Sequence, residues 1–169
     1  MSEETVNHVD MFCAPSDPVA ASADAEAVAF DEEAEEDVDI AFLSMEDVLD
    51  LHDEGMRRYT PLEPRGIKDR GLLESAVMAP QQTWGGDYLY SSLAEMAAVY
   101  LMGLAQNHAF EQGNKRVGLA ACSQFLRRNG YQLTLTQDEA INLMLRVVNG
   151  EIDRDGVVEI IEDGVTFVV

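Results

Sequence analysis

Residues 108–116 read H-A-F-E-Q-G-N-K-R and separate two stretches that have the hydrophobic periodicity of helices. The first stretch begins with a capping pair at Ser92 and carries apolar residues at helical spacing as far as His108. The second runs over residues 114–129 and is closed by Gly130. The sequence therefore predicts two helices joined by a short loop, with His108 at the end of the buried stripe of the first helix.

Four further helices are predicted from capping residues and periodicity. They are expected at residues 44–59, at 69–79, at 136–148, and in a segment that begins at Asp153 or Asp155 and ends near residue 162. Residues 131–135 are expected to be extended, and Trp84 with Gly85 and Gly86 to form a turn with a packed aromatic ring. There is no internal repeat, so we expect an all-α helical bundle.

The first forty residues differ from the rest of the chain in charge. They hold 13 acidic and no basic side chains, whereas the remainder holds 19 acidic and 11 basic side chains. Their apolar content is too low to offset the entropy of ordering. We therefore expect a disordered acidic tail over residues 1–40 and one domain over 41–169. The tail is expected to be a solvated linker, with electrostatic attraction to Lys115 and Arg116 as the alternative.

The overall charge and the cysteine count exclude several classes of protein. A net charge of −21 disfavours nonspecific binding to nucleic acids and to anionic membranes. Cys13 and Cys122 are too few for a disulfide framework or a Cys-rich metal site. Neither a signal peptide nor a membrane-spanning segment is recognisable, so we expect a soluble cytoplasmic protein.

The residues around the loop combine a base with a phosphate site. A helix start offers unpaired N–H groups and partial positive charge, to which Arg116 adds bidentate contact and Lys115 a point charge. His108 has a pKa suited to accepting a proton from an attacking hydroxyl group. A histidine that ends an apolar stripe is more often a core residue, so its catalytic interpretation depends on these neighbours.

The other loop residues have supporting roles. Gly113 allows close approach of the backbone to phosphate or a φ that a Cβ would oppose. Asn114 is expected to bind a phosphate oxygen or to cap the helix. Phe110 is expected to enter the core and anchor the loop. His52 is interpreted as structural, and Arg65, Lys68 and Asp69 as a weak candidate for substrate docking.

The string with its G-N-K-R ending resembles the signature of the Fic/Doc (Fido) family, and its Doc branch rather than the Fic branch, which ends in G-N-G-R. L-H-D at residues 51–53, G-I-K-D-R-G-L-L-E-S-A at 66–76 and F-L-R-R-N-G at 125–130 are also similar to Doc-type toxins. This resemblance covers about residues 44–163. It implies a Fido-type helical bundle, His108 as the general base, and phosphates held by Gly113, Asn114, Lys115 and Arg116.

The resemblance also implies a reaction and partners. A Doc-type lysine, here Lys115, accompanies transfer of the γ-phosphate of ATP to a Ser or Thr hydroxyl of a protein. For Doc, the target is elongation factor Tu and an antitoxin restrains the toxin. The alternatives are AMP transfer by the same residues and a binding module with weak activity.

One position departs from the family pattern. Gln112 stands where the family usually has Asp or Asn, and an acidic side chain there holds the Mg²⁺ that accompanies the nucleotide. An amide is a poorer ligand for this cation than a carboxylate. Glu111 is the alternative ligand, and ATP with Mg²⁺ remains the expected cofactor.

Overall fold

Side-chain caps set where most helices of this protein begin. The computed structural model describes residues 39–168. Ser44, Ser92 and Thr136 form capping boxes, and Asp69 and Asp153 each accept from the backbone N–H of the third residue of their helix. The described helices are α1 (Met45–Tyr59), α2 (Arg70–Met78), α3 (Leu93–Gln106), α4 (Asn114–Arg128), α5 (Gln137–Val148) and α6 (Arg154–Asp163). They confirm the predicted helices and the all-α class.

Short strands complete the fold. The helical turn η1 (Ala79–Gln81) leads into a hairpin of β1 (Thr83–Trp84) and β2 (Asp87–Tyr88), whose turn has positive φ at both glycines. The predicted turn is thus confirmed. The prediction that the Trp84 ring is packed is wrong, because Trp84 is 83% exposed. β3 (Tyr131–Leu133) confirms the extended stretch and pairs antiparallel with β4 (Val165–Phe167), which was not predicted.

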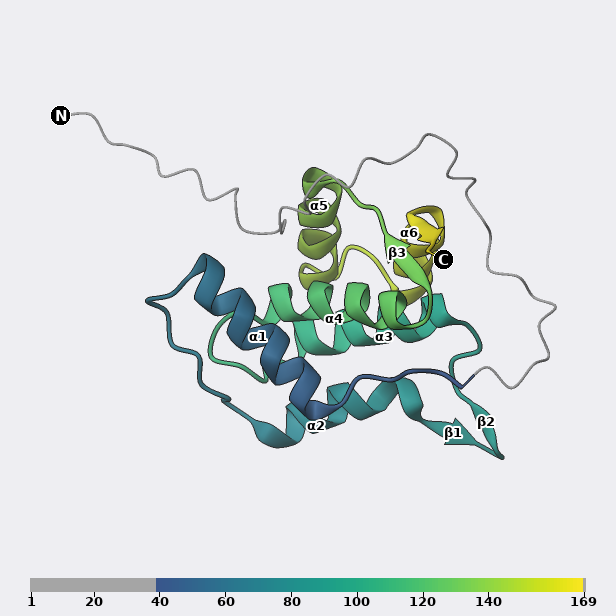
Figure 1. Ribbon diagram of the computed structural model, residues 1–169, viewed down its shortest axis with the longest axis horizontal. Coiled ribbons are helices and arrows are strands. Elements are labelled where there is room, and N and C mark those ends of the chain that lie inside the picture. The colour runs from purple at the N-terminus through teal and green to yellow at the C-terminus, as the bar shows by residue number, and fades with distance from the viewer. Residues whose placement is uncertain (1–38, 169) are drawn as a thin grey trace.

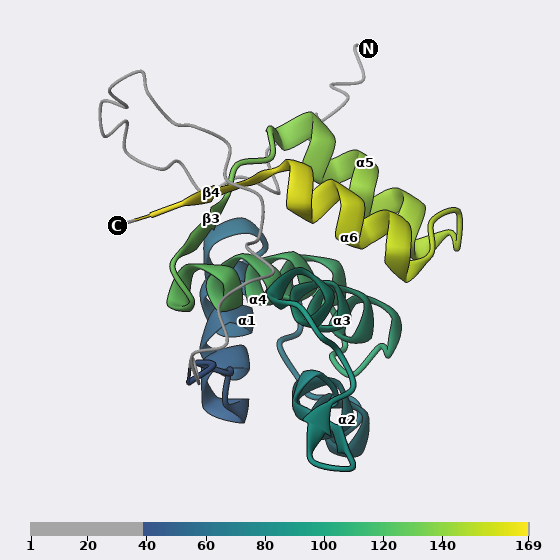
Figure 2. The ribbon, with the colours of Figure 1, turned by 90° about the vertical axis from the view of Figure 1, so that its right-hand side faces the viewer.

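Helix α3 forms the centre of the molecule. It packs against α4 along one side and also contacts α2, α5 and α6. Figure 2 shows α5 and α6 on one side of the α3–α4 pair, with α1 and α2 on the other. Tyr100 of α3 and Phe125 of α4 are fully buried, with ring centroids 5.2 Å apart. The two helices thus carry the core on which the other elements pack.

The segment before α1 is fastened to α3 and to the far end of α4. The backbone N–H of Leu43 donates to the Tyr100 hydroxyl at 3.1 Å, and that of Ala41 donates to the Asn129 amide oxygen at 2.9 Å. Arg128 donates to Asp47 at 2.9 Å, and this hydrogen bond lowers the pKa of Asp47 to about 2. These contacts hold α1 against α4, as Figure 1 shows.

The predicted acidic tail lies outside the described residues except for its last two positions. Of these, Ile40 packs against the core, and the predicted boundary between tail and domain stays a prediction. Cys13 also lies outside the described residues, whereas Cys122 is buried, which raises its pKa to about 12. None of the described helices is long and apolar enough to cross a membrane.

The backbones of helices α3 and α4 approach closely at Gly118. A Cβ at this position would lie 2.7 Å from the carbonyl oxygen of Leu101 and 3.2 Å from the backbone nitrogen of Ala105. Backbone atoms cannot move aside as the end of a flexible side chain can. Glycine is therefore required for the two helices to approach this closely.

We predict that Gly118→Ala lowers the free energy of unfolding by roughly 1–3 kcal/mol, because it overpacks the helix contact. Gly55→Ala is the matched control, since a Cβ there meets nothing within 4 Å. It should stabilise α1 by about 0.5–1 kcal/mol through helix propensity. Denaturant titration followed by far-UV circular dichroism measures both. Equal stabilisation by the two variants would contradict the close contact.

Candidate active site

The loop between α3 and α4 begins with a histidine in the left-handed region. His108 has a φ of 51°, and its side chain is exposed. Helix α3 already ends at Gln106, so the prediction that His108 finishes the buried stripe is wrong. The backbone turns two residues earlier than the hydrophobic pattern indicated. Positive φ is uncommon outside glycine and concentrates at functional sites.

Phe110 packs the loop against the core. It is buried, and its ring stacks on the imidazole of His52 with centroids 3.8 Å apart and planes 8° apart. Nε2 of His52 lies 2.8 Å from the carbonyl oxygen of Gln112. Because a carbonyl only accepts, His52 carries its proton on Nε2 and donates it to the loop. His52 is 4% exposed, and the structure confirms it as a structural residue.

Asn114 closes the loop on itself. Its amide oxygen accepts from the backbone N–H of Phe110, and its amide nitrogen donates to the carbonyl of Phe110, both at 2.9 Å. The side chain therefore shapes the loop from the first residue of α4. This arrangement is closer to the predicted capping role than to direct contact with phosphate.

A second segment runs beside the loop. The backbone carbonyl of Ala109 accepts from the backbone N–H groups of Lys68 and Asp69, at 2.8 and 3.0 Å. The backbone N–H of Glu111 donates to the carbonyl of Gly66 at 3.0 Å. The segment suggested for substrate docking therefore borders the motif. Two of its side chains have local partners, because Asp69 caps α2 and Arg65 pairs with Asp53 at 3.1 Å.

Helix α4 begins differently from the other described α-helices. Its N-cap is Gly113, which provides no side-chain cap. Gly113 has a φ of 82°, and a Cβ there would lie 2.7 Å from the sulfur of Met56 and 3.2 Å from Nε2 of His52. The backbone conformation thus favours glycine, and a larger residue would also displace the Met56 side chain. The N–H groups of the first turn are left without a side-chain acceptor at the cap, as an anion site needs.

Two cations lie in this first turn. Lys115 is exposed, and it forms no ion pair with the part of the chain that the structure describes. Arg116 is partly buried, and its Nη1 donates to the Thr60 hydroxyl at 2.9 Å and lies 3.4 Å from the sulfur of Met56. Burial lowers the pKa of Arg116, but a guanidinium stays charged in proteins.

Sequence reasoning missed the contacts of Thr60 and Met56 with Arg116. The available signal was their spacing, because Thr60 follows Met56 by four residues and Met56 follows His52 by four. This spacing places all three side chains on one face of α1. The spacing does not show which other element of the fold this face of α1 contacts.

The two candidate metal ligands are both exposed. The backbone carbonyl oxygen of Gln112 accepts the hydrogen bond from His52, which leaves its side-chain amide uninvolved in that contact. The carboxylate of Glu111 lies beside Gly66, where an added Cβ would come within 3.1 Å of both carboxylate oxygens. Within residues 39–168 there is no group of three or more His, Cys, Asp and Glu side chains that could hold a metal ion. Mg²⁺ bound with a nucleotide needs fewer protein ligands, because phosphates and water supply the rest. One carboxylate and one amide oxygen fit that requirement.

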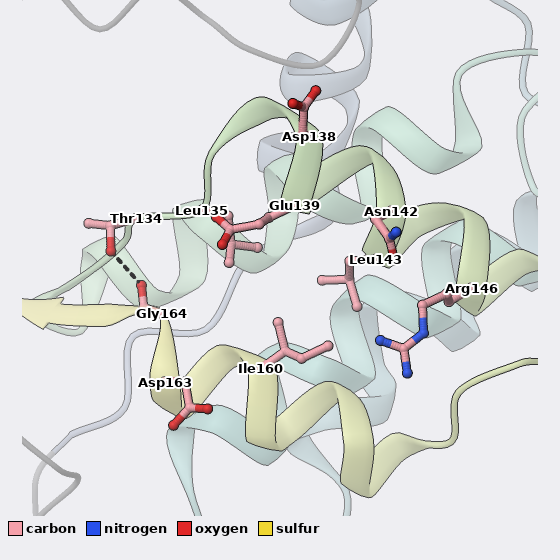
Figure 3. A pocket seen from close by; sticks show the side chains of 10 residues that line it. All are labelled: Thr134, Leu135, Asp138, Glu139, Asn142, Leu143, Arg146, Ile160, Asp163 and Gly164. Carbon is pink, nitrogen blue, oxygen red and sulfur yellow. Dashed lines mark hydrogen bonds between the residues drawn. The ribbon is translucent and has the colours of Figure 1, made fainter.

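A separate hollow of about 540 Å³ lies between α5 and α6 (Figure 3). Its polar lining includes the carboxylates of Asp138, Glu139 and Asp163, and Arg146 is its one cation. The excess of negative charge in this lining would repel the negatively charged triphosphate of a nucleotide. The start of α4 with its adjoining loop is therefore the candidate active site.

Comparison with known proteins shows the family to which the chain is similar. Residues 42–126, which include the loop, match the model of the Fic/DOC family. A protein named Toxin Doc from Mycolicibacterium smegmatis is 42% identical over 93 residues, covering 54% of this chain and 72% of that protein. Protein kinase doc of Escherichia phage P1 is 32% identical over 117 residues, covering 69% of this chain and 90% of that protein.

The buried His52 makes stability depend on pH. Burial is the main cause that lowers its pKa in the folded protein, below the value of about 6.5 expected when unfolded. The neutral form thus stabilises the fold fully above about pH 6.5, and this contribution is lost as pH falls through the folded-state pKa. We predict that His52→Gln flattens the dependence of the unfolding free energy on pH in that range. Denaturant titrations of the wild-type and variant proteins across that pH range measure the effect, and equal slopes would contradict the prediction.

Proposed function

Because the chain belongs to the Fic/DOC family, we propose that its loop transfers the γ-phosphate of ATP to a hydroxyl group of a protein. The observation that carries this proposal is the start of α4, which has no side-chain cap, presents Lys115 and Arg116, and adjoins the exposed His108. An anion site and a proton acceptor are the two elements that phosphoryl transfer from a nucleotide requires.

In the proposed step, His108 takes the proton of a Ser or Thr hydroxyl group of the target. The hydroxyl oxygen forms a bond to the γ-phosphorus as the bond from that phosphorus to the bridging oxygen breaks, and ADP leaves. The N–H groups of the first turn of α4, with Lys115 and Arg116, balance the negative charge that spreads over the phosphate oxygens. Asn114 and Phe110 keep the loop in the conformation that presents His108.

Mg²⁺ would accompany the nucleotide, with the amide oxygen of Gln112 and the carboxylate of Glu111 as the protein ligands that the loop offers. When bound, the ion would neutralise part of the phosphate charge. The other contacts with the phosphates would come from the N–H groups of the first turn of α4 and from Lys115 and Arg116.

The assignment of a kinase rests on Lys115 in the Doc-type motif and on the phage P1 relative, which is named a protein kinase. The relative from Mycolicibacterium smegmatis is named a toxin. We therefore extend the proposal to a toxin whose target is a protein such as a translation factor and whose activity an antitoxin protein restrains. AMP transfer, with attack at the α-phosphorus and release of pyrophosphate, is the alternative reaction of the same residues.

We predict that His108→Ala lowers transfer by about 10²–10⁴-fold while the fold persists, because the variant loses the proton acceptor and keeps the phosphate site. Arg127→Ala, at an exposed residue at the other end of α4, is the control and should retain activity. Incubation of a cell extract with γ-labelled or α-labelled ATP identifies the chemistry. Protein label from the α position alone would replace the kinase proposal with AMP transfer.

We further predict that Gln112→Asp strengthens Mg²⁺-dependent binding of ATP and raises activity, because a carboxylate replaces an amide facing a hard cation. Gln132→Asp on β3 adds the same charge at an exposed position outside the site and controls for net charge. Calorimetric titration with ATP at several Mg²⁺ concentrations measures the effect. An unchanged Mg²⁺ dependence would assign the metal to another ligand, with Glu111 the next to substitute.

A further inference from the structure

One face of helix α1 contacts the candidate site at three successive turns. His52 donates to the carbonyl of Gln112, Met56 lies against Gly113, and Thr60 accepts from Arg116. Since the three residues are four positions apart, they form a stripe along the helix. The stripe reaches from the loop to a cation that the proposed function assigns to phosphate binding.

Thr60 is held in place by its own backbone. It is the C-cap of α1, where its N–H donates to the carbonyl of Met56 at 3.0 Å and its carbonyl accepts from the N–H of Glu63 at 3.1 Å. Its hydroxyl lies 3.5 Å from the Met56 sulfur, to which it donates. That geometry directs the oxygen lone pairs of Thr60 toward Nη1 of Arg116, 2.9 Å away.

The consequence for Arg116 is a fixed guanidinium. A free arginine side chain loses much rotamer freedom when it binds a ligand, whereas one that is already oriented loses less. A guanidinium has five N–H donors in a planar fork, so the contact of Nη1 with Thr60 restricts the directions in which the other donors can point. The sulfur of the buried Met56 also lies against Nη1 and further restricts the movement of the guanidinium group.

We propose that Thr60 is a positioning residue for Arg116 and thereby sets the affinity of the site for nucleotide phosphates. This inference rests on the proposed function, because it requires that Arg116 bind those phosphates. Thr60 itself touches neither the nucleotide nor the target in this assignment. It acts through the orientation of the arginine.

The experiment compares Thr60→Val, which keeps the shape and removes the acceptor, with Thr60→Ser, which keeps the hydroxyl group. Calorimetric titration with Mg²⁺–ATP, without a protein target, measures affinity in the full-length protein. Thr60→Val should weaken binding about two- to tenfold, because the Arg116 side chain would then have to be ordered when the phosphates bind, and Thr60→Ser should restore binding to near the wild-type value. Thermal unfolding of each variant measures the separate effect of altering a helix cap.

A double-mutant cycle with Arg116→Ala tests the route of the effect. In the Arg116→Ala background, Thr60→Val should cause no further loss of affinity. An equal loss in both backgrounds, an equal loss in Thr60→Ser, or wild-type affinity in Thr60→Val overturns the inference. Unchanged affinity in Arg116→Ala alone overturns the phosphate assignment of the proposed function as well, which distinguishes the two failures.

Discussion

The close contact between α3 and α4 at Gly118 determines much of the rest of the structure. The two backbones approach closely near the last turns of α3, and the chain reverses direction between Gln106 and Asn114. The chain does so with left-handed backbone at both ends of the loop, at His108 and Gly113. The first turns the imidazole outward, and the second leaves the start of α4 without a side-chain cap. Helix packing and site geometry thus meet at the same end of the two helices.

The elements set by local chemistry could be predicted from the sequence. Helix starts at Ser44, Ser92 and Thr136 follow from caps whose partners lie three residues away, and these were confirmed. The errors concern features set by distant residues. The pairing of β4 with β3, the exposure of Trp84 and the early end of α3 depend on what lies nearby in space, which periodicity does not contain. The phosphate-binding and catalytic roles assigned to the motif remain predictions.

The site separates residues that present chemical groups from residues that hold them. His108 and Lys115 are exposed, whereas Phe110 and His52 are buried and stacked, and Asn114 bonds both polar groups of the Phe110 backbone. A motif in sequence does not distinguish these two kinds of residue. The supporting group from α1 lies some sixty positions earlier in the chain, so only the folded structure joins it to the loop.

The hairpin of β1 and β2 has a practical consequence for spectroscopy. Trp84 is the one tryptophan of the chain, and its indole is solvated in the folded state. Its emission spectrum therefore changes little on unfolding, so a tryptophan signal would understate the loss of structure. The same property makes the natural sequence its own fluorescent label. A blue shift of the Trp84 emission on adding another protein that lacks tryptophan would report burial of the hairpin at an interface, because no second tryptophan of this chain contributes to the signal.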